Sequence, residues 1–88
     1  MKLLILKLRK FLQLRLIVNK NISYQEFINK VQDLHKKLNG QWRLGQVYFN
    51  VLSNCRPSIA ESIRSTIHDP FHKDEISKEL ENIVQSKW

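Results

Sequence analysis

The clearest pattern of apolar and polar positions follows residue 20, where apolar side chains recur every three or four residues. Such spacing places them on one face of an α-helix. Ser23 and Glu26 form a capping box, which marks a helix start, and Asn39 with Gly40 supplies the left-handed backbone that ends helices. These signals predict a helix over residues 24–38. Its apolar face consists of Tyr24, Phe27, Ile28, Val31, Leu34 and Leu38.

Three further helices are predicted along the rest of the chain, over about 43–54, over 57–66 and near 74–87. Pro57 suits the first turn of the second of these, because its missing N–H would be unpaired there in any case. Acidic residues at the start of the last helix and Lys87 at its end complement the helix dipole. The expected fold is therefore all-α, a compact small bundle of four to five short helices.

The first twenty residues can be read in two ways. Apolar positions within 3–18 fit one broad helical face, yet parts of the stretch alternate with the period of a strand. Helix is favoured because leucine, lysine, arginine and glutamine are helix formers. We therefore expect two parts, a basic amphipathic segment over 1–20 and a single small helical domain over 21–88.

Charge is concentrated in the same segment, since 1–20 carries six lysines and arginines and no acidic residue, in a chain of net charge +7. Three interpretations stay open: a nucleic-acid-binding arm, a helix on an anionic membrane surface, or an ordinary helix whose apolar face completes the core. The last is the default, and a membrane surface is disfavoured. The candidate residues for nucleic acid or membrane are Lys7, Arg9, Lys10, Arg15 and Lys20.

Composition limits the classes of protein to which the chain can belong. With 88 residues and 42% hydrophobic content, the sequence is typical of one small globular domain. Cys55 is the only cysteine, so neither an intramolecular disulfide nor a zinc site with several thiolates can form. No stretch has the length of a signal peptide or of a membrane span. We expect a cytoplasmic protein, in the host cytoplasm if a phage encodes it.

The stretch Ile67 to His72 places two histidines around an aspartate. Imidazole and carboxylate groups can bind zinc or iron, but Pro70 breaks any shared helical face and no second ligand cluster exists. We therefore interpret the stretch as a turn, with Asp69 as the N-cap and Pro70 as the first residue of a helix. Phe71 would then fill the core between two short helices.

Catalysis has no positive support in the sequence. His35 lies on the apolar face of the helix 24–38, where a packed histidine is more common than a catalytic one, and Cys55 is most simply a small buried apolar residue. A dyad of these two residues stays open, but no other residue is spaced to act with them. Glycine-rich phosphate loops are absent. We expect no enzyme activity and no cofactor or metal.

Polar side chains mark a candidate contact surface on the helix 43–54. Phe49 is expected to project away from the apolar side of that helix, beside amides, and an aromatic residue in such a setting suits contact with another protein. The alternative, which is slightly favoured, is that this side packs against the helices 57–66 or 74–87 and its amides cap backbone groups. The candidate protein-contact residues are Gln46, Phe49, Asn50 and Ser53.

Two ordered strings carry a resemblance, QWRLGQVYFNVL at 41–52 and RPSIAESIR at 56–64, followed by Thr66 and the Asp-Pro-Phe at 69–71. From Tyr24 onward the chain resembles a group of short bacteriophage and bacterial proteins that has no assigned activity. The resemblance implies a mobile-element context. It also implies that five residues matter together: Gly45, Gln46, Asn50, Arg64 and Asp69.

The expected function is that of a non-enzymatic small binding module, phage-related, which contacts a host protein or nucleoprotein in fixed stoichiometry. The alternative is a nucleic-acid-binding protein that uses the segment 1–20. A helix-turn-helix formed by 43–54 and 57–66 is disfavoured, because its second helix offers few base-reading side chains. Self-association stays open.

Overall fold

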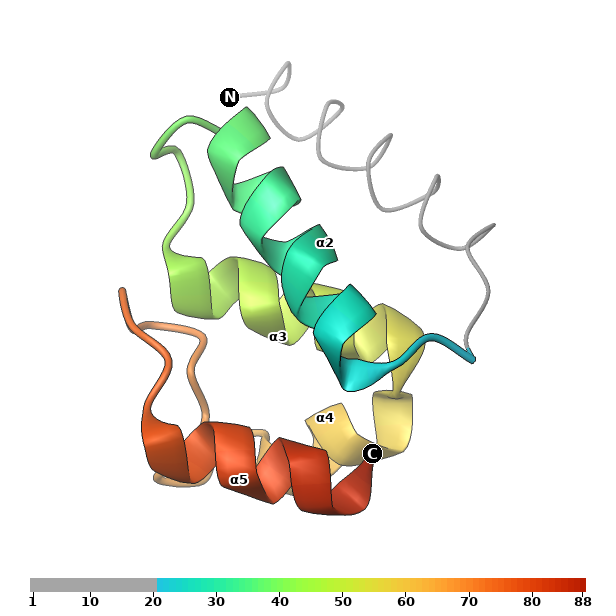
Figure 1. The fold of residues 1–88 in the computed structure, drawn as a ribbon. Helices are drawn as coiled ribbons and strands as arrows, with labels where there is room; N and C mark the ends of the chain where they lie inside the picture. The colour runs from blue at the N-terminus through green and yellow to red at the C-terminus, as the bar shows by residue number, and fades with distance from the viewer. Residues whose placement is uncertain (1–20) are drawn as a thin grey trace.

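A computed structural model describes residues 21–88 of the protein, and the predicted helix over 3–18 lies outside the described residues. Within 21–88 there are four helices and no strand, which confirms the all-α class. Figure 1 shows α2 lying across α3, with α5 on the other side of α3 and α4 near its end. The helices are α2 (Tyr24–Lys37), α3 (Leu44–Cys55), α4 (Pro57–Ile63) and α5 (Lys78–Lys87).

The first described helix, α2, follows its predicted signals closely. The Ser23 hydroxyl accepts a hydrogen bond from the Glu26 N–H at 3.1 Å, and the Glu26 carboxylate accepts one from the Ser23 N–H at 3.2 Å. Both bonds of the capping box are therefore present. After α2 ends, Asn39 and Gly40 take φ angles of 50° and 81°, the left-handed backbone that the Asn-Gly pair predicted.

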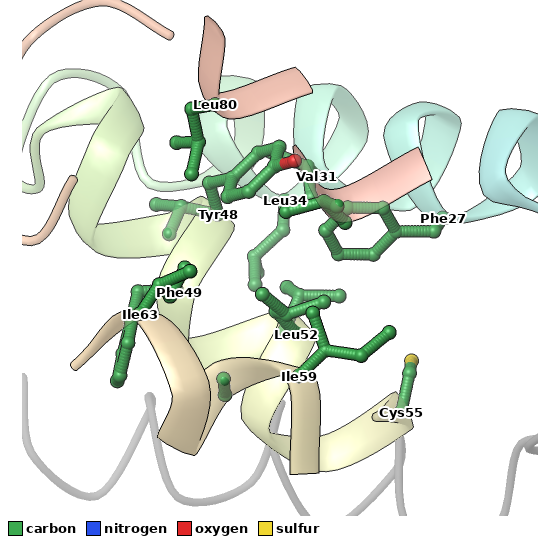
Figure 2. Packing of buried hydrophobic residues seen from close by; sticks show 14 of the residues in the cluster. Phe27, Val31, Leu34, Tyr48, Phe49, Leu52, Cys55, Ile59, Ile63 and Leu80 are labelled. Carbon is green, nitrogen blue, oxygen red and sulfur yellow. The ribbon is translucent and has the colours of Figure 1, made fainter. Parts of the chain in front are cut away.

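The central helix is α3, because it is buried on more than one side. Seven of its twelve residues are buried, and they surround the helix axis instead of lying on one narrow stripe. Figure 2 shows its Tyr48 and Leu52 among side chains of α2, α4 and α5. The buried apolar cluster thus joins all four described helices.

Two predicted helix boundaries are wrong, and both errors fall around the segment 64–77. The helix expected over 57–66 ends at Ile63, and Ser65 then takes a φ of 59°, which an α-helix cannot accommodate. The helix expected near 74–87 begins only at Lys78, where the Ser77 hydroxyl accepts the Leu80 N–H at 3.1 Å. A serine cap thus defines this start more strongly than the acidic residues before it.

The end of the chain closes the core against its first described residues. The indole N–H of Trp88 donates to the Ile22 carbonyl at 2.9 Å, and the Trp88 ring packs against Tyr24 and Phe27 at centroid distances of 5.5 and 5.1 Å. The Arg56 guanidinium carbon lies 4.5 Å from the centroid of the same ring. Sequence periodicity did not predict these contacts, because Trp88 follows the last predicted helix.

Candidate functional site

A concave surface of about 430 Å³ lies between α3 and the non-helical chain after α4. We call it the polar concavity. Its aromatic part consists of Phe49 and Phe71, and polar side chains complete the lining. These polar residues are Asn50, Ser53, Arg64, Ser65, Asp69 and His72.

The position of the chain after α4 depends on a close backbone approach to Gly45. The Gly45 N–H donates to the Lys73 carbonyl at 2.9 Å. A Cβ atom at Gly45 would lie 1.9 Å from the Pro70 carbonyl oxygen and 2.5 Å from that of Lys73, distances that real side chains do not show. Only glycine fits at this point without moving the turn, so the residue determines one wall of the polar concavity.

Asp69 organises the turn from within. One oxygen of its carboxylate accepts the Ser65 N–H at 2.7 Å, and the other accepts the Phe71 N–H at 3.0 Å. The expectation that Asp69 caps a helix starting at Pro70 is wrong, since the described chain has no helix there. The Lys73 N–H instead donates to the Pro70 carbonyl at 2.8 Å, as in a turn. Asx-type bonding of this kind competes with helix formation.

Phe49 is buried, with 5% of its surface exposed, so the prediction that it projects away from the core is wrong. Its ring meets that of Phe71 edge to face, with centroids 6.1 Å apart and planes at 83°. The Arg64 guanidinium lies over the Phe49 ring at 5.2 Å, and its Nε donates to Glu61 at 3.1 Å. Phe71 was expected to fill the core and does pack against it, but its contact with Phe49 was not predicted, because sequence periodicity cannot reveal a partner on a non-helical segment.

The amide and hydroxyl candidates on α3 divide between the polar concavity and its surroundings. Asn50 and Ser53 line the concavity, whereas Gln46 is half-buried and does not. The Ser53 hydroxyl donates to the Phe49 carbonyl at 2.9 Å, a bond within α3. The Asn50 side-chain amide has no hydrogen-bond partner within residues 21–88. It is therefore available to a ligand at the rim.

Of the residues that the resemblance grouped, three meet at the polar concavity: Asn50, Arg64 and Asp69. Gly45 does not line the concavity, but its close contact with the Pro70 and Lys73 backbone positions the turn that does. Ser65 and His72 also line the concavity, although neither was predicted as a contact residue. Their spacing carries no helical or strand signal, so only the folded turn brings them to this surface.

The histidines do not form a common site. His68 lies 3.9 Å from a Glu79 carboxylate oxygen, and His72 packs its ring against Phe71 at 5.1 Å. His35 is half-buried in the last turn of α2. Within residues 21–88, no group of three or more histidine, cysteine, aspartate or glutamate side chains could hold a metal ion.

The geometry also separates His35 from Cys55. A short loop joins the end of α2 to the start of α3, so the last turn of α2 lies near the first turn of α3 (Figure 1). Cys55 is the twelfth and last residue of α3, and a helix of this length is about 18 Å long. The two residues therefore lie toward opposite ends of the α2–α3 pair, which does not suit a catalytic dyad.

Two tyrosine hydroxyls meet at the edge of the core, where sequence periodicity predicted only apolar packing. The hydroxyls of Tyr24 and Tyr48 lie 3.1 Å apart and share a hydrogen bond. Burial raises the pKa of both groups above their ordinary value of 10.0. The pair therefore stays protonated and neutral at physiological pH, which suits a structural role.

The basic candidates of the N-terminal segment, Lys7, Arg9, Lys10, Arg15 and Lys20, lie outside the described residues. Across 21–88, none of the helices has the length and apolar character needed to cross a membrane. In comparisons with known proteins, no family model, no curated protein and no solved structure matches the chain.

Proposed function

We propose that the protein is a non-enzymatic binding module, from a phage or mobile element, that contacts a host protein or nucleoprotein through the polar concavity. The observation that carries the proposal is the convergence of Asn50, from α3, with Arg64 and Asp69, from the chain after α4, on one concave surface. Asp69 uses both carboxylate oxygens within the turn, which keeps the surface in a fixed shape for a partner.

The chemistry of the surface favours contact with a protein. Aromatic rings and an arginine form the kind of centre that dominates protein–protein binding energies, and a rim of neutral polar groups can pair with peptide backbone. Ile67 adds apolar area on the same turn, since 85% of its surface is exposed, and it is the one large hydrophobic residue so exposed within 21–88. Because so little of the Ile67 side chain packs within the domain, its apolar surface is available to a partner.

The test compares partners captured from host extract by the wild-type chain and by variants. Asn50→Ala and Arg64→Ala remove lining side chains without opening the core, because both residues keep part of their surface in solvent. Asn82→Ala is the matched control, because Asn82 is exposed on α5 and does not line the polar concavity. The proposal predicts a partner retained by wild type and Asn82→Ala but weakened about fivefold or more by either lining variant.

Affinity measured with the purified partner then gives the deciding value, with thermal unfolding as a check that each variant folds. Equal affinity for the wild type and both lining variants would remove the polar concavity from consideration. Phe49→Ala is unsuitable as a test, because deleting a buried ring destabilises the fold whether or not the surface binds a partner.

The second candidate function is nucleic-acid binding through the segment 1–20. Its support is the charge distribution, since 1–20 has six lysines and arginines without an acid, whereas 21–88 has nine against eight acidic residues. Replacing Lys7, Arg9 and Lys10 by glutamine in the full chain should then weaken binding to DNA or RNA. The affinity of the wild type should also fall steeply as salt is raised. Salt-insensitive binding, or none, would contradict this candidate.

A further inference from the structure

A second concave surface, of about 350 Å³, lies where α2, α3, the stretch 75–76 and the first turns of α5 meet. Its apolar lining includes Val31 and Tyr48, which are buried, and three residues that are only partly buried. Those three are Ile28, Leu44 and Ile76. Apolar area from three separate elements is thus left accessible within one hollow.

Two carboxylates line the same hollow, those of Glu75 and Glu81, and we call it the acidic concavity. Among the described residues, no lysine or arginine lines it. Within residues 21–88, neither carboxylate takes part in an ion pair. The neighbouring acids differ, since Asp74 lies 3.7 Å from an Arg43 nitrogen and Glu79 lies 3.9 Å from a nitrogen of His68.

Glu81 lies close enough to the apolar lining for its charge to act there. Burial and the interaction with Tyr24 raise the pKa of the Tyr48 hydroxyl, and the negative charge of Glu81 adds a smaller effect in the same direction. The side chain of Glu81 is itself half-buried. A carboxylate in this position loses part of its hydration and gains more from a cationic partner than a fully exposed one would.

We propose that the acidic concavity binds a lysine or arginine side chain of a partner protein, presented by a basic amphipathic segment. The aliphatic stem of such a side chain covers apolar surface while its charged head stays at the rim, here beside Glu75 and Glu81. Apolar neighbours on the partner segment cover Ile28, Leu44 and Ile76. The surface is distinct from the polar concavity, so this inference does not depend on the function proposed above.

The negative charge of the acidic concavity limits the class of partner that can bind there. Two unpaired carboxylates repel phosphate groups, so nucleic acid and anionic lipid are unsuitable for this surface. A free polyamine would satisfy the carboxylates, but it would leave the three partly buried apolar residues uncovered. A protein segment supplies both the cation and the apolar side chains, and it is the occupant that fits the whole lining.

The test is a titration of the full chain, followed through the methyl signals of Ile28, Leu44 and Ile76 in nuclear magnetic resonance spectra. The probe is a short amphipathic peptide of leucine and lysine, compared with the same peptide carrying glutamate for lysine and with spermidine. The lysine peptide should shift these three signals and leave unchanged those of Ile63, which is buried, and of Ile67, which is exposed on the turn after α4. The glutamate peptide should not shift them.

Paired variants separate a specific site from general attraction. Glu75→Gln with Glu81→Gln should weaken binding of the lysine peptide about tenfold, as expected for losing two partly exposed charge pairs. Asp74→Asn with Glu79→Gln removes the same charge from the adjacent surface and should have less than about a twofold effect. Signals of buried Val51 and Val84 report whether each variant keeps its fold.

Three results would overturn the proposal. The first is no shift of the three methyl signals with the lysine peptide at millimolar concentration. The second is an equal loss of binding in both paired variants, which would mean general attraction. The third is equal binding of spermidine and the peptide, which would make a small polyamine the ligand in place of a protein.

Discussion

The two concave surfaces differ in how the chain builds them. The polar concavity depends on a non-helical segment held by backbone contacts, above all the Gly45 N–H on the Lys73 carbonyl and the two bonds accepted by Asp69. The acidic concavity is lined mainly by side chains of α2 and α3, with Glu75 and Ile76 just before α5 and Glu81 within it. One surface therefore depends on hydrogen-bond geometry, and the other on where helices leave apolar side chains uncovered.

This difference decides what each surface offers a partner. In the polar concavity the charged groups already have partners, because Arg64 pairs with Glu61 and Asp69 with backbone N–H groups. Shape, aromatic edges and the Asn50 amide are left for recognition. In the acidic concavity Glu75 and Glu81 have no ion-pair partner within 21–88, so charge is the main signal.

The largest effect on this comparison should come from Gly45→Ala. Because the new Cβ would lie 1.9 Å from the Pro70 carbonyl oxygen, the turn must move away from α3. We expect a loss of about 3 kcal/mol or more in the free energy of unfolding, measured by urea denaturation, although alanine is the better helix former.

Gly40→Ala is the matched control, because nothing lies within 4 Å of the added Cβ and only the φ of +81° opposes it. Its cost should be about 1 kcal/mol. A Gly45→Ala protein as stable as Gly40→Ala would show that the close backbone approach does not hold the turn.

A smaller effect is expected from Asp69→Ala, which leaves the Ser65 and Phe71 N–H groups without their acceptor. The loss in unfolding free energy should be about 1–3 kcal/mol. Asp69→Asn keeps one oxygen acceptor, so its loss in unfolding free energy should be smaller than that of Asp69→Ala. In nuclear magnetic resonance spectra, signals from the polar concavity should change in both variants, while the methyl signals of Ile28 and Leu44 stay in place. Equal changes at both concave surfaces would contradict the claim that the two surfaces are built independently.

The smallest effect concerns Tyr48, whose ring lines the acidic concavity and whose hydroxyl meets that of Tyr24. Burial raises the pKa of Tyr48 above 10.0 in the folded state, so above about pH 10 the unfolded chain loses this proton while the folded chain keeps it. Stability present below pH 10 is therefore lost as pH rises further. Tyr48 alone contributes at most about 1.4 kcal/mol per pH unit.

Tyr48→Phe should flatten this loss between about pH 10 and 11, at the cost of about 1 kcal/mol at neutral pH for the missing hydrogen bond. Urea denaturation of both proteins across that range measures the difference. The same slope in wild type and Tyr48→Phe would mean that the Tyr48 hydroxyl ionises as readily in the folded state as in the unfolded chain.

How much the sequence revealed differs between the helices and the turn. The capping box at Ser23 and the Asn-Gly stop predicted α2 almost to the residue, because local hydrogen bonds decide both ends. The segment 64–77 was predicted poorly, since its course depends on contacts with Gly45, which is distant in sequence. The residue types around Asp69 predicted a turn, but they could not predict which two N–H groups its carboxylate binds.

The candidate site shows the same limit. Asn50 and Ser53 were selected as contact residues and do line the polar concavity, whereas Phe49 proved to be buried because Phe71 and Arg64 cover it. A helical pattern shows which residues share a face of one helix. It cannot show which non-helical segment returns to cover that face.

The most direct test of the account is amide hydrogen exchange in the full chain, because the central claim is that the polar concavity is preformed. The Gly45, Ser65 and Phe71 N–H groups should exchange far more slowly than the exposed Ser58 N–H, which lies in the first turn of α4, where helical N–H groups lack intrahelical partners. Exchange of Ser65 and Phe71 as fast as that of Ser58 would mean that the turn opens freely, and the polar concavity would then not be a fixed surface.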